Sequence, residues 1–340
     1  MVVRGFALVA ASLIVAAAAT GVGTGVGAKT TGWRWNLPAG VEVPGVPADN
    51  PMTPDKIALG RRLFYDGRLS VGGTMSCATC HQQHRAFASA TVTHPGIGGN
   101  PGRRNVPGLV NVAWHGVLSW HDPNVSSLEA QVATPMFGTS PVEMGARPKE
   151  VLGRLSADAC YRDMFRAADP AGGGTITISG IYRALAAFQR TMVSYSTPYD
   201  ADRRGDATAL SPAARRGKAV FEGNCASCHS GPNFADDRFH AIRAPDPEAD
   251  DAGLMDTTGK PADNGRFRTA PLRNVALTGP YMHDGSVATL PAAIRRHDVA
   301  AGMGEGEVGD LVSFLGALTD EAFVRNPALS RPTSACGKTI

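Results

Sequence analysis

The sequence predicts a mainly α-helical protein with long loops and little β-sheet. Three observations support this fold class. The pentapeptide Cys-x-x-Cys-His occurs twice, at residues 77–81 and 225–229. A helix-start pattern followed by the same apolar stripe precedes each copy. Glycine and proline are abundant, at 40 and 24 of the 340 residues, which is typical of short helices joined by long loops.

The repeated pentapeptide is the covalent attachment motif of c-type haem. Two thiols at this spacing each add to one vinyl group of the porphyrin, and the adjacent histidine presents a ring nitrogen to the iron. A thioredoxin-like redox pair and half of a zinc site share the cysteine spacing, but neither explains a histidine directly after both pairs. The sequence therefore predicts two covalent haems. The residues expected to hold them are Cys77, Cys80, His81, Cys225, Cys228 and His229.

The helix ahead of each haem motif is repeated in the chain. Thr53-Pro54 and Ser211-Pro212 each provide an N-cap residue and a proline at the first helical position. Gly60-x-x-Leu63-Phe64 and Gly217-x-x-Val220-Phe221 then place the same stripe on both helices. With 43% hydrophobic residues, the chain is long enough to bury two cores. We therefore predict two cytochrome c-like domains, each wrapped around one haem.

Periodicity and composition assign the remaining segments. Ile178 to Tyr195 predicts a long amphipathic helix, and Val308 to Leu318 predicts a short apolar one. Pro198 to Ser211 is polar and predicts the domain boundary, whereas Ala241 to Asp263 predicts a loop. The predicted organisation is a signal peptide (1–28), an extended N-terminal arm (29–52), an N-terminal cytochrome c-like domain (53–200), a C-terminal cytochrome c-like domain (201–332) and a tail (333–340).

The N-terminus predicts export. Arg4 supplies a positive charge, residues 6–19 form an apolar run too short to span a bilayer comfortably, and Val26-Gly27-Ala28 is the expected cleavage site. An uncleaved membrane anchor is the alternative. Because c-type haem is attached outside the bacterial cytoplasm, we expect a periplasmic protein. In that oxidising compartment Cys160 and Cys336 could pair, but the sequence leaves their disulfide open.

The charge pattern argues against one class of partner. The formal net charge is +3, and the two signs are interspersed along the chain. A nucleic-acid-binding face needs a basic cluster, so we expect no nucleic-acid partner.

Several further motifs resemble those of the bacterial diheme cytochrome c peroxidase/MauG superfamily, from about Trp35 to about Pro332. Besides the haem motifs, the resemblance is carried by residues 59–66, 104–113, 127–131, 141–145 and 272–285. Within the superfamily, residues 36–38, 49–52, 135–138 and 318–323 are most similar to the MbnH-like branch. Members of that branch, like MauG, oxidise aromatic side chains on a partner protein.

The resemblance implies that hydrogen peroxide reacts at the N-terminal haem, with His81 as its proximal ligand. Cleavage of the O–O bond needs a base that takes one proton and an acid that returns it to the leaving oxygen. Glu143 matches the family's catalytic glutamate, and Gln131 and Pro135 match its neighbours in that pocket. A solvated loop carboxylate is the alternative interpretation of Glu143.

The resemblance also implies a link between the haems and a calcium site. Trp120 matches the tryptophan that couples the two haems, although Trp114 is close by and a buried structural role is the alternative. Asn105, Thr278 and Pro280 match an interdomain calcium site built from one side-chain oxygen and two backbone carbonyls. Oxygen ligands are those that calcium prefers.

The C-terminal haem, with His229 as its proximal ligand, is implied to be the electron-transfer haem. In the family its sixth ligand is a Met or a Tyr, fourteen residues after the histidine of the His-Asp-Gly motif. Counting from His283 gives His297, so this chain departs from the pattern. We expect His297 to be the sixth ligand, with Met303 or Met282 as the alternatives.

Two other histidines are weaker candidates. Peroxidases that need reductive activation carry a distal histidine between the first haem motif and the Asn-x-Pro segment. His94 lies in that interval at an unusual spacing, and a loop histidine is the alternative. His240 is expected to line the pocket of the second haem.

These inferences give three functional hypotheses. The first is an exported diheme peroxidase that receives electrons from a small cytochrome c or a copper protein through the C-terminal haem. The second is a MauG/MbnH-like enzyme that oxidises Trp or Tyr on a partner protein. The third is a diheme electron carrier, which has no need of a distal carboxylate. A homodimer also stays open, because many relatives form one.

Overall fold

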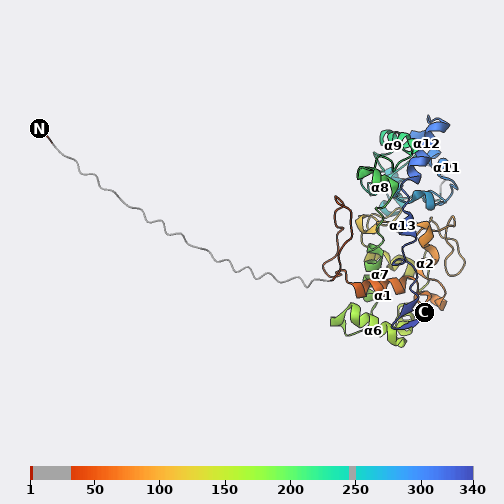
Figure 1. Ribbon diagram of the computed structural model, residues 1–340. Helices are drawn as coiled ribbons and strands as arrows, with labels where there is room; N and C mark the ends of the chain where they lie inside the picture. Colours follow the sequence, from red (N-terminus) through yellow and green to blue (C-terminus); the bar gives the residue numbers. More distant parts are fainter. Residues whose placement is uncertain (3–31, 245–249, 340) are drawn as a thin grey trace. The chain divides into compact units, whose positions relative to one another are not determined.

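The computed structural model describes residues 1–2, 32–244 and 250–339 (Figure 1). The described residues from 32 onward form one compact unit. The predicted signal peptide and its cleavage site lie in the stretch 3–31, outside the described residues. Within the described ranges, no helix is long and apolar enough to cross a membrane.

The predicted mainly helical fold with little sheet is confirmed. The α-helices are α1 (Pro54–Phe64), α2 (Cys77–Cys80), α3 (Leu128–Gln131), α4 (Ala133–Phe137), α5 (Pro148–Ala157), α6 (Ala159–Ala168), α7 (Ile178–Arg190), α8 (Pro198–Arg203), α9 (Pro212–Asn224), α10 (Met255–Thr258), α11 (Leu290–Arg295), α12 (Glu305–Gly316) and α13 (Glu321–Val324). The strands β1 (Phe239–His240) and β2 (Phe267–Arg268) form one antiparallel pair, and β3 (Ser334–Ala335) and β4 (Lys338–Thr339) form another. Single 3-10 turns, among them η4 (Val112–Trp114) and η7 (Val275–Leu277), punctuate the loops.

Helix α1 begins where the sequence predicts and packs across α7 (Figure 1). The hydroxyl of Thr53 accepts a hydrogen bond from the N–H of Lys56 at 3.2 Å, which caps the helix. At Gly60 the two helices approach so closely that a Cβ atom would lie 1.8 Å from the carbonyl oxygen of Ala184. Only glycine fits this crossing.

Helix α9 repeats the arrangement with α12 (Figure 1). The hydroxyl of Ser211 accepts from the N–H of Ala214 at 3.1 Å. A Cβ atom on Gly217 would lie 1.9 Å from the carbonyl oxygen of Asp310. The predicted repeat of one helix ahead of both haem motifs is therefore confirmed, and its glycine serves the same close crossing in both copies.

We expect Gly60→Ala to lower the free energy of unfolding by about 1–3 kcal/mol, because a methyl group in a closed crossing forces the helices apart. Gly153 is the matched control. It lies on α5, where an added Cβ atom would have no neighbour within 4 Å, so Gly153→Ala should raise the free energy of unfolding by about 0.5–1 kcal/mol. Urea unfolding gives the free energy of unfolding of both variants. Equal changes in the two variants would contradict the close crossing.

Two large hydrophobic clusters fill most of the interior, and a third, smaller one includes Val112 and Leu128. The first includes Phe64 and Phe188, where α1 meets α7. The second includes Phe221 and Phe314, where α9 meets α12. One cluster lies beside each haem motif, in keeping with two cytochrome c-like domains, whose boundaries stay predictions.

The helix predicted for residues 178–195 ends five residues earlier, at Arg190. Asn111 forms hydrogen bonds with the backbone of the segment that follows Arg190. Its N–H donates to the carbonyl oxygen of Met192 at 2.8 Å, and its side-chain oxygen accepts the N–H of Ser194 at 2.7 Å. These backbone groups are therefore not available to continue the helix.

Asn111 has a counterpart in Asn274. Both are buried, both have left-handed backbone with φ of 53° and 62°, and each directly precedes a 3-10 turn, η4 or η7. Both also bind Ser194, Asn274 through a 3.0 Å hydrogen bond to its hydroxyl. Asparagine tolerates this backbone conformation better than most residues. The paired segments Asn111-Val-Ala and Asn274-Val-Ala were a second internal repeat available in the sequence.

Segments expected to be irregular contain some structure. The 198–211 boundary holds α8, in which Asp200 forms a buried ion pair with Arg273 at 2.8 Å. The 241–263 loop holds α10. In the tail, Cys336 forms a disulfide with Cys160 at the start of α6, which closes the question that the sequence left open.

Candidate functional site

The first Cys-x-x-Cys-His motif forms α2 and the residue after it. Nδ1 of His81 lies 2.7 Å from the carbonyl oxygen of Phe87. A carbonyl only accepts, so Nδ1 carries the proton and Nε2 has a free lone pair, the tautomer of a metal-ligating histidine. Burial lowers the pKa of His81 to about 4, so the ring is neutral at neutral pH. His81 is therefore ready to bind iron through Nε2.

The thiols of this motif differ from those of a redox pair. Cys77 and Cys80 are not bonded to each other. Burial raises the pKa of both thiols to about 12, helped by the neighbouring thiol for Cys77 and by Glu143 for Cys80. Cysteines in thioredoxin-like motifs and at metals have lowered pKa values. The raised thiol pKa values therefore disfavour a thioredoxin-like redox pair.

The second motif repeats the arrangement. Nδ1 of His229 donates to the carbonyl oxygen of Phe234 at 3.1 Å, and burial lowers the pKa of His229 to about 4. Phe234 and Phe87 both have left-handed backbone, with φ of 54° and 60°. This conformation is rare for bulky residues, and in both loops its carbonyl fixes a histidine ring.

Two arginines with a buried Nε atom bear on what the motifs bind. In the part of the chain that the structure describes, Nε of Arg85 and Nε of Arg268 are buried without an acceptor. Such a group costs about 1–3 kcal/mol when unpaired, so each indicates an acceptor on a bound group. Haem carries two propionate carboxylates that accept such bonds. Free thiols, neutral histidines and arginine Nε atoms without an acceptor together fit two covalent haems.

Glu143 lies on a loop that backbone hydrogen bonds hold from two sides. The N–H of Ile97 donates to the carbonyl oxygen of Glu143 at 2.7 Å, and the N–H of Met144 donates to that of Pro135 at 3.0 Å. Pro135 lies on α4, which begins two residues after Gln131 ends α3. The three pocket residues that the family resemblance implies thus lie on adjoining segments.

The Glu143 side chain is half-buried, and this argues against a fully solvated loop carboxylate. Burial raises the pKa of Glu143 above its usual value, and the charge of His94 offsets part of this effect. The Glu143 charge also helps to raise the pKa of Cys80, and the His94 charge helps to lower that of His81. Both side chains therefore lie near the first haem motif.

The raised pKa of Glu143 predicts a pH profile for the reaction with peroxide. Only the carboxylate can accept a proton, so the rate falls as the pH falls through the pKa. We expect this acid limb at a higher pH than for an exposed glutamate, and we expect Glu143→Gln to abolish it. Stopped-flow rates across pH test both points. An acid limb that survives in the variant would assign it to another group.

Trp120 connects segments from both halves of the chain. Its Nε1 donates to the carbonyl oxygen of Asn105 at 2.8 Å, and its own carbonyl accepts the N–H of Arg268 on β2 at 2.9 Å. Trp114 instead donates through Nε1 to the carbonyl oxygen of Glu42 on the N-terminal arm, at 2.8 Å. The structure therefore separates the two tryptophans, and the role of Trp120 as a link between the haems stays a prediction.

The implied calcium ligands receive less support. The side-chain N–H of Asn105 donates to the carbonyl oxygen of Val92 at 2.9 Å. Thr278 follows η7, and Arg85 donates to the carbonyl of Gly279, just before Pro280. A cationic guanidinium beside this segment does not favour a bound cation. Calcium at Asn105, Thr278 and Pro280 stays a prediction.

His297 lies near His229. Their ring centres are 6.4 Å apart, and Nδ1 of His297 lies 2.9 Å from the carbonyl oxygen of Ala293, which leaves its Nε2 free. Two imidazoles that bind one metal from opposite sides through Nε2, at about 2 Å each, have ring centres roughly 6 Å apart. This separation fits a shared iron. Met303 packs against the second hydrophobic cluster.

His240 is engaged differently. Its Nε2 lies 2.7 Å from a carboxylate oxygen of Asp236. Ligand atoms of Cys228, Asp236 and His240 lie within 4.8 Å of one another. Because Cys228 belongs to the haem motif, we do not assign a separate metal to this group.

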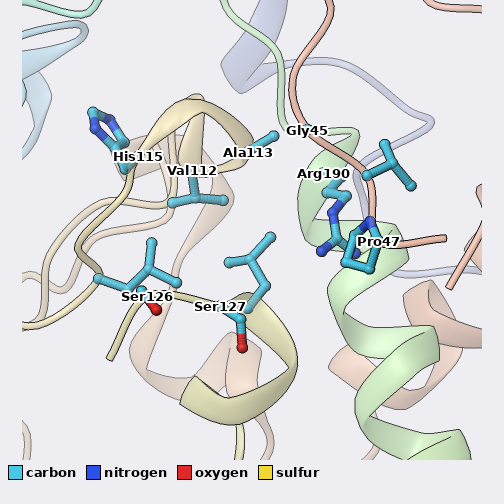
Figure 2. Close-up of a pocket in the computed structure, with 11 residues that line it drawn as sticks. Gly45, Pro47, Val112, Ala113, His115, Ser126, Ser127 and Arg190 are labelled. Atoms are coloured by element: carbon cyan, nitrogen blue, oxygen red, sulfur yellow. The ribbon is translucent and has the colours of Figure 1, made fainter. Parts of the chain in front are cut away.

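A cavity of about 330 Å³ lies away from these residues (Figure 2). It is walled by the arm at Gly45 and Pro47, by Ser126 and Ser127, and by Arg190. Arg190 is itself paired with Glu129 at 2.7 Å, so the cavity offers no free charge there. It contains none of the predicted site residues.

Some functional candidates were missed by sequence reasoning. The two arginines with a buried Nε atom, Arg85 and Arg268, have no pattern that marks them in a single sequence. His115 pairs with Asp237 at 2.8 Å across the two halves, and its other nitrogen is buried without a partner in the described ranges. These residues are identified only by their surroundings, which the fold brings together from distant parts of the chain.

The chain is similar to several known proteins. The family model for di-haem cytochrome c peroxidase matches residues 54–208. The MauG methylamine utilization protein of Methylorubrum extorquens is 38% identical over 295 residues, 81% of each chain. The cytochrome-c peroxidase IdrP1 of Denitromonas iodatirespirans is 35% identical over 81% of this chain and 84% of that one. The crystal structure of a MauG-like protein associated with microbial copper homeostasis superposes with a TM-score of 0.84 and 38% identity, over 88% of this chain and 99% of that one.

Proposed function

The chain belongs to the di-haem cytochrome c peroxidase and MauG family, and from this premise we propose that it reduces hydrogen peroxide with electrons from a small redox protein. Members of the family carry two c-type haems, and the chain is an oxidoreductase acting on peroxide. We further propose that it works in the periplasm, where an exported c-type protein receives its haems.

The residues that would hold the haems are the two Cys-x-x-Cys-His motifs. Bound there, the haem irons supply the electron transfer that reduces peroxide to water. The free Nε2 atoms of His81 and His229 support the proximal assignments, and the ring separation of 6.4 Å supports His297 as the second ligand of the C-terminal haem. Two imidazole ligands would leave that iron no position for peroxide, which would suit a site that only passes electrons.

Glu143 is the residue that transfers protons in this proposal. A carboxylate oxygen accepts the first proton of peroxide and then returns it to the oxygen that leaves as water. Partial burial keeps the pKa of Glu143 above its usual value, so its carboxyl holds a proton more readily than an exposed glutamate does. The single observation that carries the proposal is this half-buried carboxyl beside the first haem motif.

The test uses the holoprotein with a reduced small c-type cytochrome or copper protein. Reduction of peroxide to water takes two electrons, so we expect two molecules of one-electron donor to be oxidised for each peroxide consumed. Absorbance of the donor and a peroxide assay give the ratio. Peroxide consumption without donor oxidation would contradict a donor-fed peroxidase.

The second candidate is oxidation of a Trp or Tyr side chain on a partner protein. The superposition at a TM-score of 0.84 on a MauG-like protein favours it. A histidine in place of the Tyr ligand of MauG-type enzymes weighs against it. Mass spectrometry of a protein encoded by a neighbouring gene, after reaction with the holoprotein and peroxide, decides: a gain of oxygen on one aromatic residue would reverse the order of the two candidates.

A further inference from the structure

A row of aromatic rings runs from the N-terminal arm into the interior. Ring centres are 5.9 Å apart for Trp33 and Trp35, 6.0 Å for Trp35 and Trp114, and 5.6 Å for Trp114 and Tyr195. All three pairs have the edge-to-face arrangement of rings in contact. None of these residues belongs to the site described above, and the two arm tryptophans precede the segment that matches the family model.

The inner end of the row lies beside the second haem motif. The guanidinium carbon of Arg273 lies 4.4 Å from the ring centre of Tyr195 and 5.8 Å from that of Phe234. The carbonyl oxygen of Phe234 accepts the hydrogen bond from Nδ1 of His229. A short succession of contacts therefore joins His229 to Tyr195.

The outer end of the row reaches solvent. Tyr195 is only 4% exposed, whereas Trp33, Trp35 and Trp114 are partly exposed. Adjacent aromatic rings in contact exchange single electrons readily, and indole and phenol are among the most easily oxidised side chains. The row is thus a continuous path between the second haem motif and the surface of the arm.

We propose that Trp33, Trp35, Trp114 and Tyr195 form a one-electron relay between the C-terminal haem and a docking point for the electron donor on the N-terminal arm. This rests on the proposed function. Each electron that an arm indole passes inward is replaced by one from the donor, and two such transfers, with two protons, reduce one peroxide to two waters.

Charge gives the relay its direction. The Arg273 cation over Tyr195 disfavours removal of an electron from that ring. Within the described residues, no arginine or lysine lies over the three indoles in this way. An electron vacancy is therefore more stable on the tryptophans, nearer the surface, than on Tyr195. Electrons consequently enter at the arm and flow inward.

The indole N–H groups keep the relay reversible. Nε1 of Trp114 donates to a backbone carbonyl, and Nε1 of Trp33 is buried without a partner in the described ranges. Neither environment contains a base that would take the proton from an oxidised indole. As long as donor is present, the oxidised indole therefore regains its electron and is not covalently modified.

The test withholds the donor. The holoprotein receives a few equivalents of peroxide alone, and mass spectrometry then locates added oxygen in its peptides. Without donor, an arm indole gives up two electrons and two protons to peroxide and takes an oxygen atom from water, so one tryptophan is hydroxylated and peroxide becomes water. We expect the added oxygen on Trp33 and Trp35, and a reduction of roughly tenfold or more when reduced donor is included.

Variants establish the route. Tyr195→Phe keeps the ring packing but removes the oxidisable phenol, and Trp114→Phe breaks the row at its middle. Both should lower oxygen addition on the arm by roughly tenfold or more. Tyr182→Phe is the control, because Tyr182 packs against Phe137 outside the row, and it should leave the pattern unchanged.

The outcomes separate the relay from the enzyme function. If the wild-type protein consumes peroxide but the arm tryptophans stay unmodified, or are modified equally in Trp114→Phe and Tyr195→Phe, the relay is wrong and the peroxidase proposal stands. If the wild-type protein consumes no peroxide, the proposed function fails, and the relay fails with it. A circular dichroism spectrum confirms that each variant is folded.

Discussion

Glu143→Gln is expected to slow the reaction of the holoprotein with peroxide by about 100-fold or more, the usual loss when a general acid–base is removed. Glutamine has nearly the same shape but cannot take a proton from peroxide or return one. The loop should keep its place, because its hydrogen bonds to Ile97 and Pro135 involve backbone atoms only. Stopped-flow absorbance at several peroxide concentrations gives the second-order rate constant.

Glu222→Gln is the matched control for this prediction. Glu222 is an exposed carboxylate on α9, so the substitution removes the same charge without touching the first haem motif. Its rate should equal that of the wild type. A Glu143→Gln rate within about threefold of the wild type would remove Glu143 from the mechanism, since general acid–base catalysis contributes far more than that.

His297→Ala is expected to convert the second haem from low-spin to high-spin while the spectrum of the first haem stays unchanged. The reason is that the ring centres of His297 and His229 lie 6.4 Å apart, a separation that would suit two ligands of one iron, with Nδ1 of His297 fixed by Ala293 and its Nε2 free. Loss of one of two imidazoles leaves five ligands, which weakens the ligand field on that iron alone. Electron paramagnetic resonance resolves the two haems.

Arg296→Ala is the control for this substitution, because Arg296 is the exposed neighbour at the same helix end. It should leave both spectra unchanged. If His297→Ala also leaves both unchanged, Met303 or Met282 becomes the ligand to examine, and the geometric argument from the 6.4 Å ring separation is wrong.

Much of the fold could be predicted because it rests on local signals. The N-caps and prolines that start α1 and α9 depend on neighbouring residues, and so do the two Cys-x-x-Cys-His turns. The glycines of the repeat, Gly60 and Gly217, indicated a shared helix before the structure gave the reason, which is contact with a backbone carbonyl of another helix.

Other features depend on residues far apart in the chain and could not be predicted locally. The end of α7 at Arg190 follows from capture of the next segment by Asn111. The Cys160–Cys336 disulfide spans 176 residues. Of the site, the family resemblance supplied Glu143 and Trp120, whereas the half-burial of the carboxyl and the position of the indole between the halves needed the structure.

The central claim is that the iron held by His81 keeps one face accessible beside the Glu143 carboxyl, while the iron held by His229 is closed by a second ligand. Cyanide titration of the holoprotein, followed by electron paramagnetic resonance before and after brief reduction, tests it most directly. The account predicts that one haem per chain binds cyanide and the other keeps its low-spin signal. If neither haem binds cyanide, before or after reduction, the central claim is contradicted and the protein is an electron carrier.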